Sequence, residues 1–185
     1  YTTLFRSNLV RSVEEIQKLQ ETNKRSLGVL RPESVSDVFF EPFSLKELSE
    51  WKKRYDAVLA QGELDFIAEE KRNLKPIPPP CFRFKITFHC EDERCTKGHS
   101  CSVLDWEIDA LFNSLKQRGD SDKLAAIKVA DKLKDICSPE NDFRFFMGNI
   151  STHPTMFTIV GLWYPKKSKA FANAMPLFAT TEDSH

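Results

Sequence analysis

Residues 82–101 of the chain read FRFKITFHCEDERCTKGHSC. In the first half of this stretch, large apolar residues alternate with polar ones from Phe82 to Phe88, which is the period of a β-strand with one buried face. Three cysteines and a histidine then follow within twelve residues: Cys90, Cys95, His99 and Cys101. The stretch therefore predicts a half-buried strand that leads directly into a metal-binding loop.

Thiolate sulfur and imidazole nitrogen are ligands that zinc prefers, in a tetrahedral shell. The spacing Cys90-x4-Cys95-x3-His99 supplies three of them, so we expect a zinc ion here. The fourth ligand is either Cys101 or Cys137. Cys101 is so close to His99 that both could bind one ion only across a sharp turn, whereas Cys137 would arrive from the end of a helix and close the site from a distance. Four sulfur or nitrogen ligands fill the shell, which favours a structural ion. The competing interpretation is that these thiols are ordinary core residues.

Downstream of the loop, apolar residues at helical spacing predict one helix from about residue 104 to 119 and a second over 121–136. Residues 143–147 and 156–164 read as two strands of a hairpin. Together with the first strand, this order predicts an α+β domain over residues 82–165, in which a small mixed or antiparallel sheet carries helices on one face.

The rest of the chain falls into four expected parts. Residues 1–7 match the translated end of a sequencing adapter, so we expect an artefact there. Residues 8–75 read as a mainly helical segment with a short strand at 35–40, residues 76–81 as a stiff Pro-rich linker, and residues 166–185 as a flexible tail. Because the chain has no initiator Met, we expect it to come from a longer parent.

Asp105, Trp106 and Glu107 follow the metal loop, and His153 lies in the expected hairpin turn. Two carboxylates and a histidine near a metal are candidate catalytic residues of a hydrolase or nuclease. The simpler interpretation of the acids is helix capping, with Ser102 as N-cap and Asp105 in the first turn. The simpler interpretation of His153 is that it lies in an ordinary turn, because a segment rich in Gly, Asn and Pro forms a turn without any functional role.

Composition limits the possible partners. The 27 Lys and Arg residues balance the 27 Asp and Glu residues, so no overall field draws the chain to nucleic acid or to an acidic membrane. No apolar run is long enough to span a bilayer. Five cysteines, an odd number, argue against a secreted disulfide framework and favour reduced thiols in the cytoplasm.

Four segments resemble an uncharacterised family of prokaryotic proteins: 26–32, 84–107, 136–142 and 145–154. The family pattern is C-x4-C-x-G-H-x5-D-W-E, followed by L-C-x-P-D-R-D, F-F-V-G-N and H-P. This chain departs from it by one extra residue between Cys95 and Gly98. The resemblance implies a role for the matching positions, which are Cys90, Cys95, Gly98, His99, Asp105, Trp106, Glu107, Cys137 and His153. It also implies a β-rich N-terminal domain in the parent, and it favours Cys137 over Cys101 as fourth ligand.

Family members end in a tail similar to peptides that dock on the sliding clamp. Here 174–178 (Ala-Met-Pro-Leu-Phe) keeps the apolar anchors but lacks the Gln. The leading hypothesis is a zinc-stabilised binding module in nucleic-acid transactions. Its candidate phosphate contacts are the five basic residues Arg83, Lys85, Lys166, Lys167 and Lys169. The alternatives are a metal-dependent hydrolase using His99, Asp105, Glu107 and His153, or a purely structural interaction domain.

Overall fold

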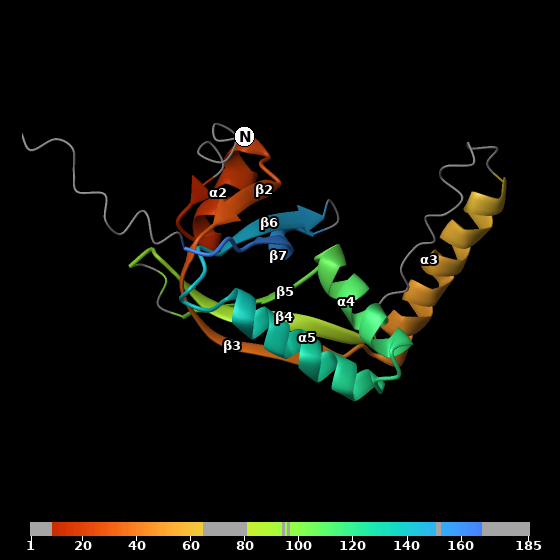
Figure 1. The fold of residues 1–185 in the computed structure, drawn as a ribbon. Coiled ribbons are helices and arrows are strands. Elements are labelled where there is room, and N and C mark those ends of the chain that lie inside the picture. The colour runs from red at the N-terminus through yellow and green to blue at the C-terminus, as the bar shows by residue number, and fades with distance from the viewer. Residues whose placement is uncertain (1–8, 65–80, 94, 96, 151–152, 168–185) are drawn as a thin grey trace, which may run out of the picture.

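A computed structural model describes residues 9–64, 81–93, 95, 97–150 and 153–167. It shows four helices and seven strands in these residues, which confirms the expected α+β class (Figure 1). The elements follow one another as β1 (Leu9–Val10), α2 (Val13–Asn23), β2 (Leu27–Leu30), β3 (Pro32–Pro42), α3 (Leu45–Leu64), β4 (Phe82–Cys90), β5 (His99–Ser102), α4 (Trp106–Gln117), α5 (Asp122–Ile136), β6 (Arg144–Ile150) and β7 (His153–Trp163).

A three-stranded antiparallel sheet has the order β3-β4-β5. The predicted alternation in β4 is confirmed, since Phe84, Ile86 and Phe88 are buried while the residues between them are partly exposed. Helices α4 and α5 lie beside this sheet (Figure 1). The Phe112 ring of α4 packs against Phe84 at 6.4 Å between centroids, so α4 covers the apolar face of β4.

A four-stranded sheet has the order β1-β2-β6-β7, in which β6 and β7 form the predicted hairpin. Helix α2 packs against this sheet, and Gly28 permits the close approach because a Cβ there would collide with Ile16 of α2. The two sheets share one core, in which the Phe88 ring of β4 meets the Phe145 ring of β6 at 5.1 Å. A parallel bridge between Val103 and Ile159 also joins them.

The segment 8–75 contains the expected helices, but it also supplies three strands. Strand β2 pairs with β6, and β3 pairs with β4 along its whole length, so this segment is built into the same two sheets as 82–165. The strand expected at 35–40 is therefore present and longer than predicted. Periodicity underestimated β3 because two register shifts interrupt it, at Pro32/Ser34 and Val35/Asp37.

The ends of the expected segments are only partly described. The adapter-like residues 1–7, all of the linker except Cys81, and the tail beyond Lys167 lie outside the described residues, and so does the clamp-like stretch 174–178. Within the described ranges, no helix is both long and apolar enough to cross a membrane.

Candidate metal centre

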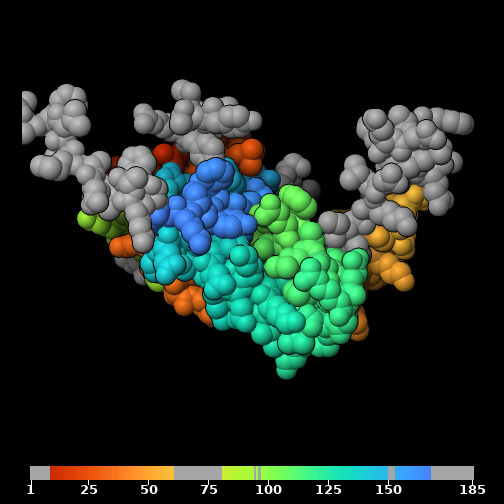
Figure 2. Space-filling view, in the orientation of Figure 1, coloured from red at the N-terminus to blue at the C-terminus, as the bar shows by residue number. Residues whose placement is uncertain are grey.

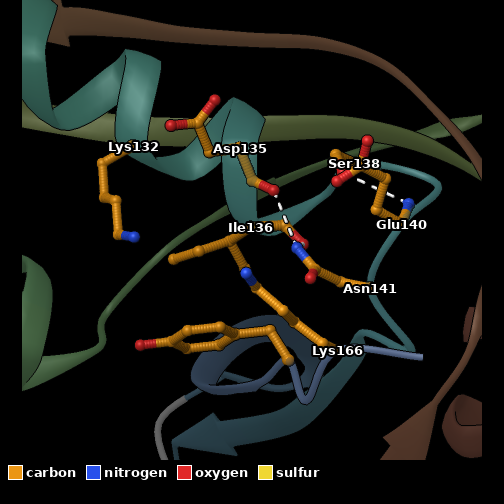
Figure 3. A pocket seen from close by; sticks show the side chains of 8 residues that line it. Lys132, Asp135, Ile136, Ser138, Glu140, Asn141 and Lys166 are labelled. Carbon is orange, nitrogen blue, oxygen red and sulfur yellow. Dashed lines mark hydrogen bonds between the residues drawn. The ribbon is translucent and has the colours of Figure 1, made fainter. Parts of the chain in front are cut away.

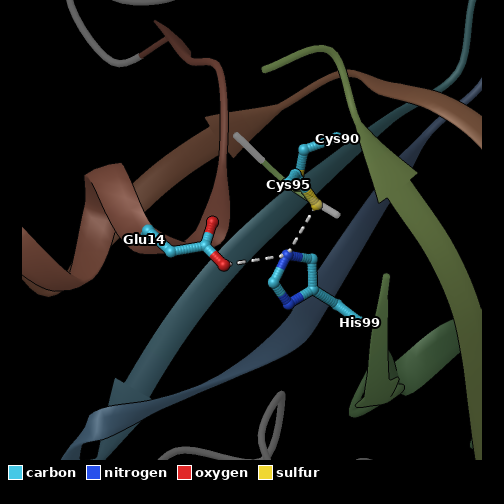
Figure 4. Close-up of side chains that lie close together, drawn as sticks. All are labelled: Glu14, Cys90, Cys95 and His99. Atoms are coloured by element: carbon cyan, nitrogen blue, oxygen red, sulfur yellow. Dashed lines mark hydrogen bonds and ion pairs between the residues drawn. The ribbon is translucent and has the colours of Figure 1, made fainter. Parts of the chain in front are cut away.

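Four side chains from different parts of the fold converge beside the end of β4 (Figure 4). Cys90 is the last residue of β4, Cys95 lies in the following loop, and His99 begins β5. The fourth is Glu14, from the first turn of α2. One ligand atom from each lies within 4.8 Å of every other.

The two distances from His99 are close to the spacing of ligands around a tetrahedral ion. The His99 Nε2 atom lies 3.2 Å from the Cys95 Sγ atom and 3.3 Å from the Glu14 Oε1 atom. Zinc bonds of about 2.0–2.3 Å place neighbouring tetrahedral ligands roughly 3.3–3.8 Å apart. Two thiols, an imidazole and a carboxylate are all zinc ligands. The residues present therefore fit the ion that the sequence predicted.

Local structure fixes the ligands. The Ser12 hydroxyl accepts the Glu15 N–H at 3.1 Å and so caps α2, which sets the position of its first turn and of Glu14. In the loop, the Cys95 N–H donates to the Asp92 carbonyl at 2.8 Å. Gly98 has φ of 57°, in the left-handed region, and this turns the chain into β5.

Burial distinguishes the ligands from one another. Cys90 is only 2% exposed, and burial, followed by the neighbouring Cys95, raises the pKa of its thiol to about 12. A metal that binds Cys90 must therefore displace a proton at neutral pH. Glu14 is the opposite case, since its side chain is 58% exposed. The centre thus has a buried thiol on one side and a solvent-facing carboxylate on the other.

Neither predicted fourth ligand belongs to this group of four. Cys101 shares the buried face of the sheet with Cys90, but it pairs with Ile86, four residues back along β4. At about 3.3 Å per residue, that places it roughly 13 Å along the strand. Cys137 ends α5 and lines hollows beside Val35 of β3. Burial raises the pKa of both thiols, to about 11 for Cys101 and about 12 for Cys137.

The candidate catalytic residues do not meet in the described structure. Asp105 is buried and is itself the N-cap of α4, accepting the Glu107 N–H at 2.9 Å. Capping is therefore confirmed for Asp105, but the expected cap Ser102 is wrong, because Ser102 still belongs to β5. Glu107 is exposed in the first turn of α4.

His153 lies exposed at the start of β7. Asp105 contacts Leu162, near the other end of this strand. The nine residue steps from His153 to Leu162 span about 30 Å at 3.3 Å per step. A single site that uses Asp105 and His153 together is therefore not present in this arrangement.

Sequence reasoning missed Glu14, because an acid in the first turn of a helix is favoured by the helix dipole and needs no further role. The neighbouring Glu15 has a different partner, since its Oε2 accepts the Arg11 N–H at 2.6 Å. An acid in the first helical turn that the cap does not need is a weak signal. Only the docking of α2 shows that it faces His99.

A family model described as a domain of unknown function (DUF8757) matches residues 9–182. This agrees with the expected membership of an uncharacterised family, while the exact residue pattern stays a prediction. No curated protein and no solved structure matches the chain.

Proposed function

The chain belongs to the DUF8757 family, and we propose that it is a zinc-stabilised binding module of a cytoplasmic protein. The observation that carries the proposal is the convergence of Glu14, Cys90, Cys95 and His99 within 4.8 Å. The cytoplasmic part rests on the five cysteines, all of which are free thiols.

The place of the centre supports a stabilising role. Glu14 belongs to the helix that packs on the four-stranded sheet, whereas Cys90 and His99 belong to the three-stranded sheet. An ion bound to all of them would join α2 to β4 and β5. Because such a site does not exist in the unfolded chain, the free energy of metal binding would add to the free energy of folding.

Two of the basic residues expected to contact nucleic acid are already paired with acidic residues of the chain. The nucleic-acid hypothesis relied on basic residues, of which Arg83 contacts Glu41 and Glu47, while Lys85 contacts Glu41 at 2.8 Å. These ion pairs neutralise two of the five candidate phosphate contacts within the chain, and Lys169 lies outside the described residues. The proposal therefore rests on the metal centre and does not require a basic face.

The hydrolase alternative receives less support. A catalytic zinc keeps one open position, and here four protein ligands lie within reach of one ion. The exposed Glu14 carboxylate is the only ligand of the four that solvent reaches easily. An open site would therefore have to form by release of Glu14.

The test is elemental analysis of the chain purified without added metal, with four variants measured alongside it. We expect one zinc per chain, lost in Cys95→Ser. Mutation of a residue that only supports a metal ligand lowers metal affinity by roughly tenfold or more. Because Glu14 would bind the ion directly, Glu14→Ala should lower zinc affinity by at least about tenfold. Glu21→Ala, also on α2 but outside the group of four, and Cys137→Ser should keep the wild-type zinc content.

Thermal unfolding with and without a chelator completes the test. Zinc removal should lower the melting temperature of the wild type and leave that of Cys95→Ser unchanged. Three results would contradict the proposal. The purified chain could contain no metal, both Cys95→Ser and Glu14→Ala could keep the full zinc content, or the chelator could leave the melting temperature of the wild type unchanged.

A further inference from the structure

A hollow of about 630 Å³ lies away from the metal centre, at the end of α5. Its wall consists of the last turn of α5, the turn that follows it, and residues after β7 (Figure 3). In the space-filling view, these C-terminal residues lie directly against the end of α5 (Figure 2). The volume is in the range of small-molecule sites.

Two lysines, Lys132 and Lys166, line this hollow. Two other lysines of α5 do have acidic partners: Lys128 contacts Asp120 at 2.7 Å, and Lys134 contacts Asp131 at 3.9 Å. Within the part of the chain that the structure describes, neither Lys132 nor Lys166 has such a partner. Their charges are therefore available to a ligand.

Acidic groups also occur in the lining, namely Asp135 and Glu140. In Figure 3, the Asp135 carboxylate points away from the ammonium groups of Lys132 and Lys166. The carbonyls at the end of α5 would repel an anion as well, but Asn141 covers two of them. Its Nδ2 donates to the Asp135 carbonyl at 2.8 Å and to the Ile136 carbonyl at 3.0 Å. The Asp135 carboxylate and the two covered carbonyls are thus turned away from the two lysines.

Backbone pairing holds the hollow in shape. Asn141 and Lys166 form an antiparallel bridge. On either side of it, the Asp142 N–H donates to the Pro165 carbonyl at 2.9 Å, and the Lys167 N–H donates to the Glu140 carbonyl at 3.1 Å. A site preformed in this way needs little ordering when it binds a ligand.

We propose that this hollow binds a small phosphomonoester, with the phosphate between Lys132 and Lys166. A phosphate dianion matches two ammonium groups in charge, and lysine binds phosphate as a point charge. The Tyr164 ring, also in the lining, supplies a flat wall for the organic part of the ligand. This site is independent of the metal centre.

The experiment is a titration of the full chain with AMP, inorganic phosphate and adenosine, in which binding is measured by calorimetry and by the amide NMR signals of residues 136–138, 140 and 141. We expect AMP and phosphate to bind and adenosine not to bind. Lys132→Gln and Lys166→Gln should each weaken AMP binding by about tenfold, the cost of one charge-assisted hydrogen bond. Lys134→Gln, on the same helix but already ion-paired, should bind as the wild type does.

Absence of saturable binding at about 10 mM AMP or phosphate would overturn the site. So would equal binding of adenosine, or unchanged affinity in both lysine variants. Zinc content and melting temperature measured on the same samples separate this result from the metal proposal, since neither lysine belongs to the group of four metal ligands.

Discussion

Asp105 joins the start of α4 to β7 through Leu162. The Oδ2 atom of Asp105 accepts the backbone N–H of Leu162 in β7 at 3.0 Å, while its Oδ1 atom accepts the Glu107 N–H at 2.9 Å. The residue is only 6% exposed. One buried carboxylate therefore fixes both the start of α4 and the edge strand of the four-stranded sheet.

Asp105→Ala should destabilise the fold, because two backbone N–H groups lose their acceptor. Loss of the cap costs about 1 kcal/mol, and an unsatisfied buried donor costs about 1–3 kcal/mol. We expect a loss of about 2–4 kcal/mol in the free energy of unfolding, measured with denaturant. Asp105→Asn keeps one acceptor and should lose less. A variant as stable as the wild type that had lost an enzymatic activity would instead favour the catalytic interpretation.

Local patterns predicted much of this fold. The alternation from Phe82 to Phe88 predicted β4, and Ser44-x2-Glu47 at the start of α3 has the spacing of a capping box. In that box, the Ser44 N–H donates to the Glu47 carboxylate at 2.9 Å and the Ser44 hydroxyl accepts the Glu47 N–H at 3.3 Å. Three of the four members of the metal centre were also predictable, because they lie within ten residues of one another.

The parts that depend on packing were not predictable. Glu14 reaches His99 only because α2 packs on the four-stranded sheet. The sequence around Glu14 gives no signal that predicts this contact. Cys137 looked like the closing ligand because it ends a helix after the metal loop. The packing of α5 against β3 instead places it beside Val35. A contact between distant segments depends on the whole core, which a local pattern does not encode.

Gly98→Ala should damage the metal loop. Gly98 has φ of 57°, and a Cβ there would lie 2.9 Å from the His89 Nε2 atom. The left-handed conformation alone costs an L-residue about 1–2 kcal/mol. We expect both a lower free energy of unfolding and weaker zinc binding, because the loop would shift between Cys95 and His99.

Gly119→Ala is the matched control for this variant. Gly119 has φ of 99°, but a Cβ there would meet no atom within 4 Å. It should therefore cost stability without changing zinc affinity. If the two variants weakened zinc binding equally, the effect would come from general destabilisation and not from the loop.

Asp109 should make the free energy of unfolding depend on pH. Burial, with a smaller effect of the Asp105 charge, raises the pKa of its carboxyl from 3.8 to about 6. The folded state therefore keeps the Asp109 proton at pH values where the unfolded chain has lost it. The stability that this group contributes is fully present below about pH 4 and is lost as the pH rises through about 6.

Asp109→Asn imitates the protonated form at every pH, so it should stabilise the protein above pH 6 and change little below pH 4. At 1.36 kcal/mol per pKa unit, the gain is at most about 3 kcal/mol, and partial exposure of the residue should reduce it to about 1–2 kcal/mol. Denaturant unfolding of both proteins from about pH 4 to pH 8 measures the difference. Asp131→Asn, at an exposed position of α5, should show no such pH dependence. A gain for Asp109→Asn that stayed constant across this range would mean that the substitution acts by packing and not by charge.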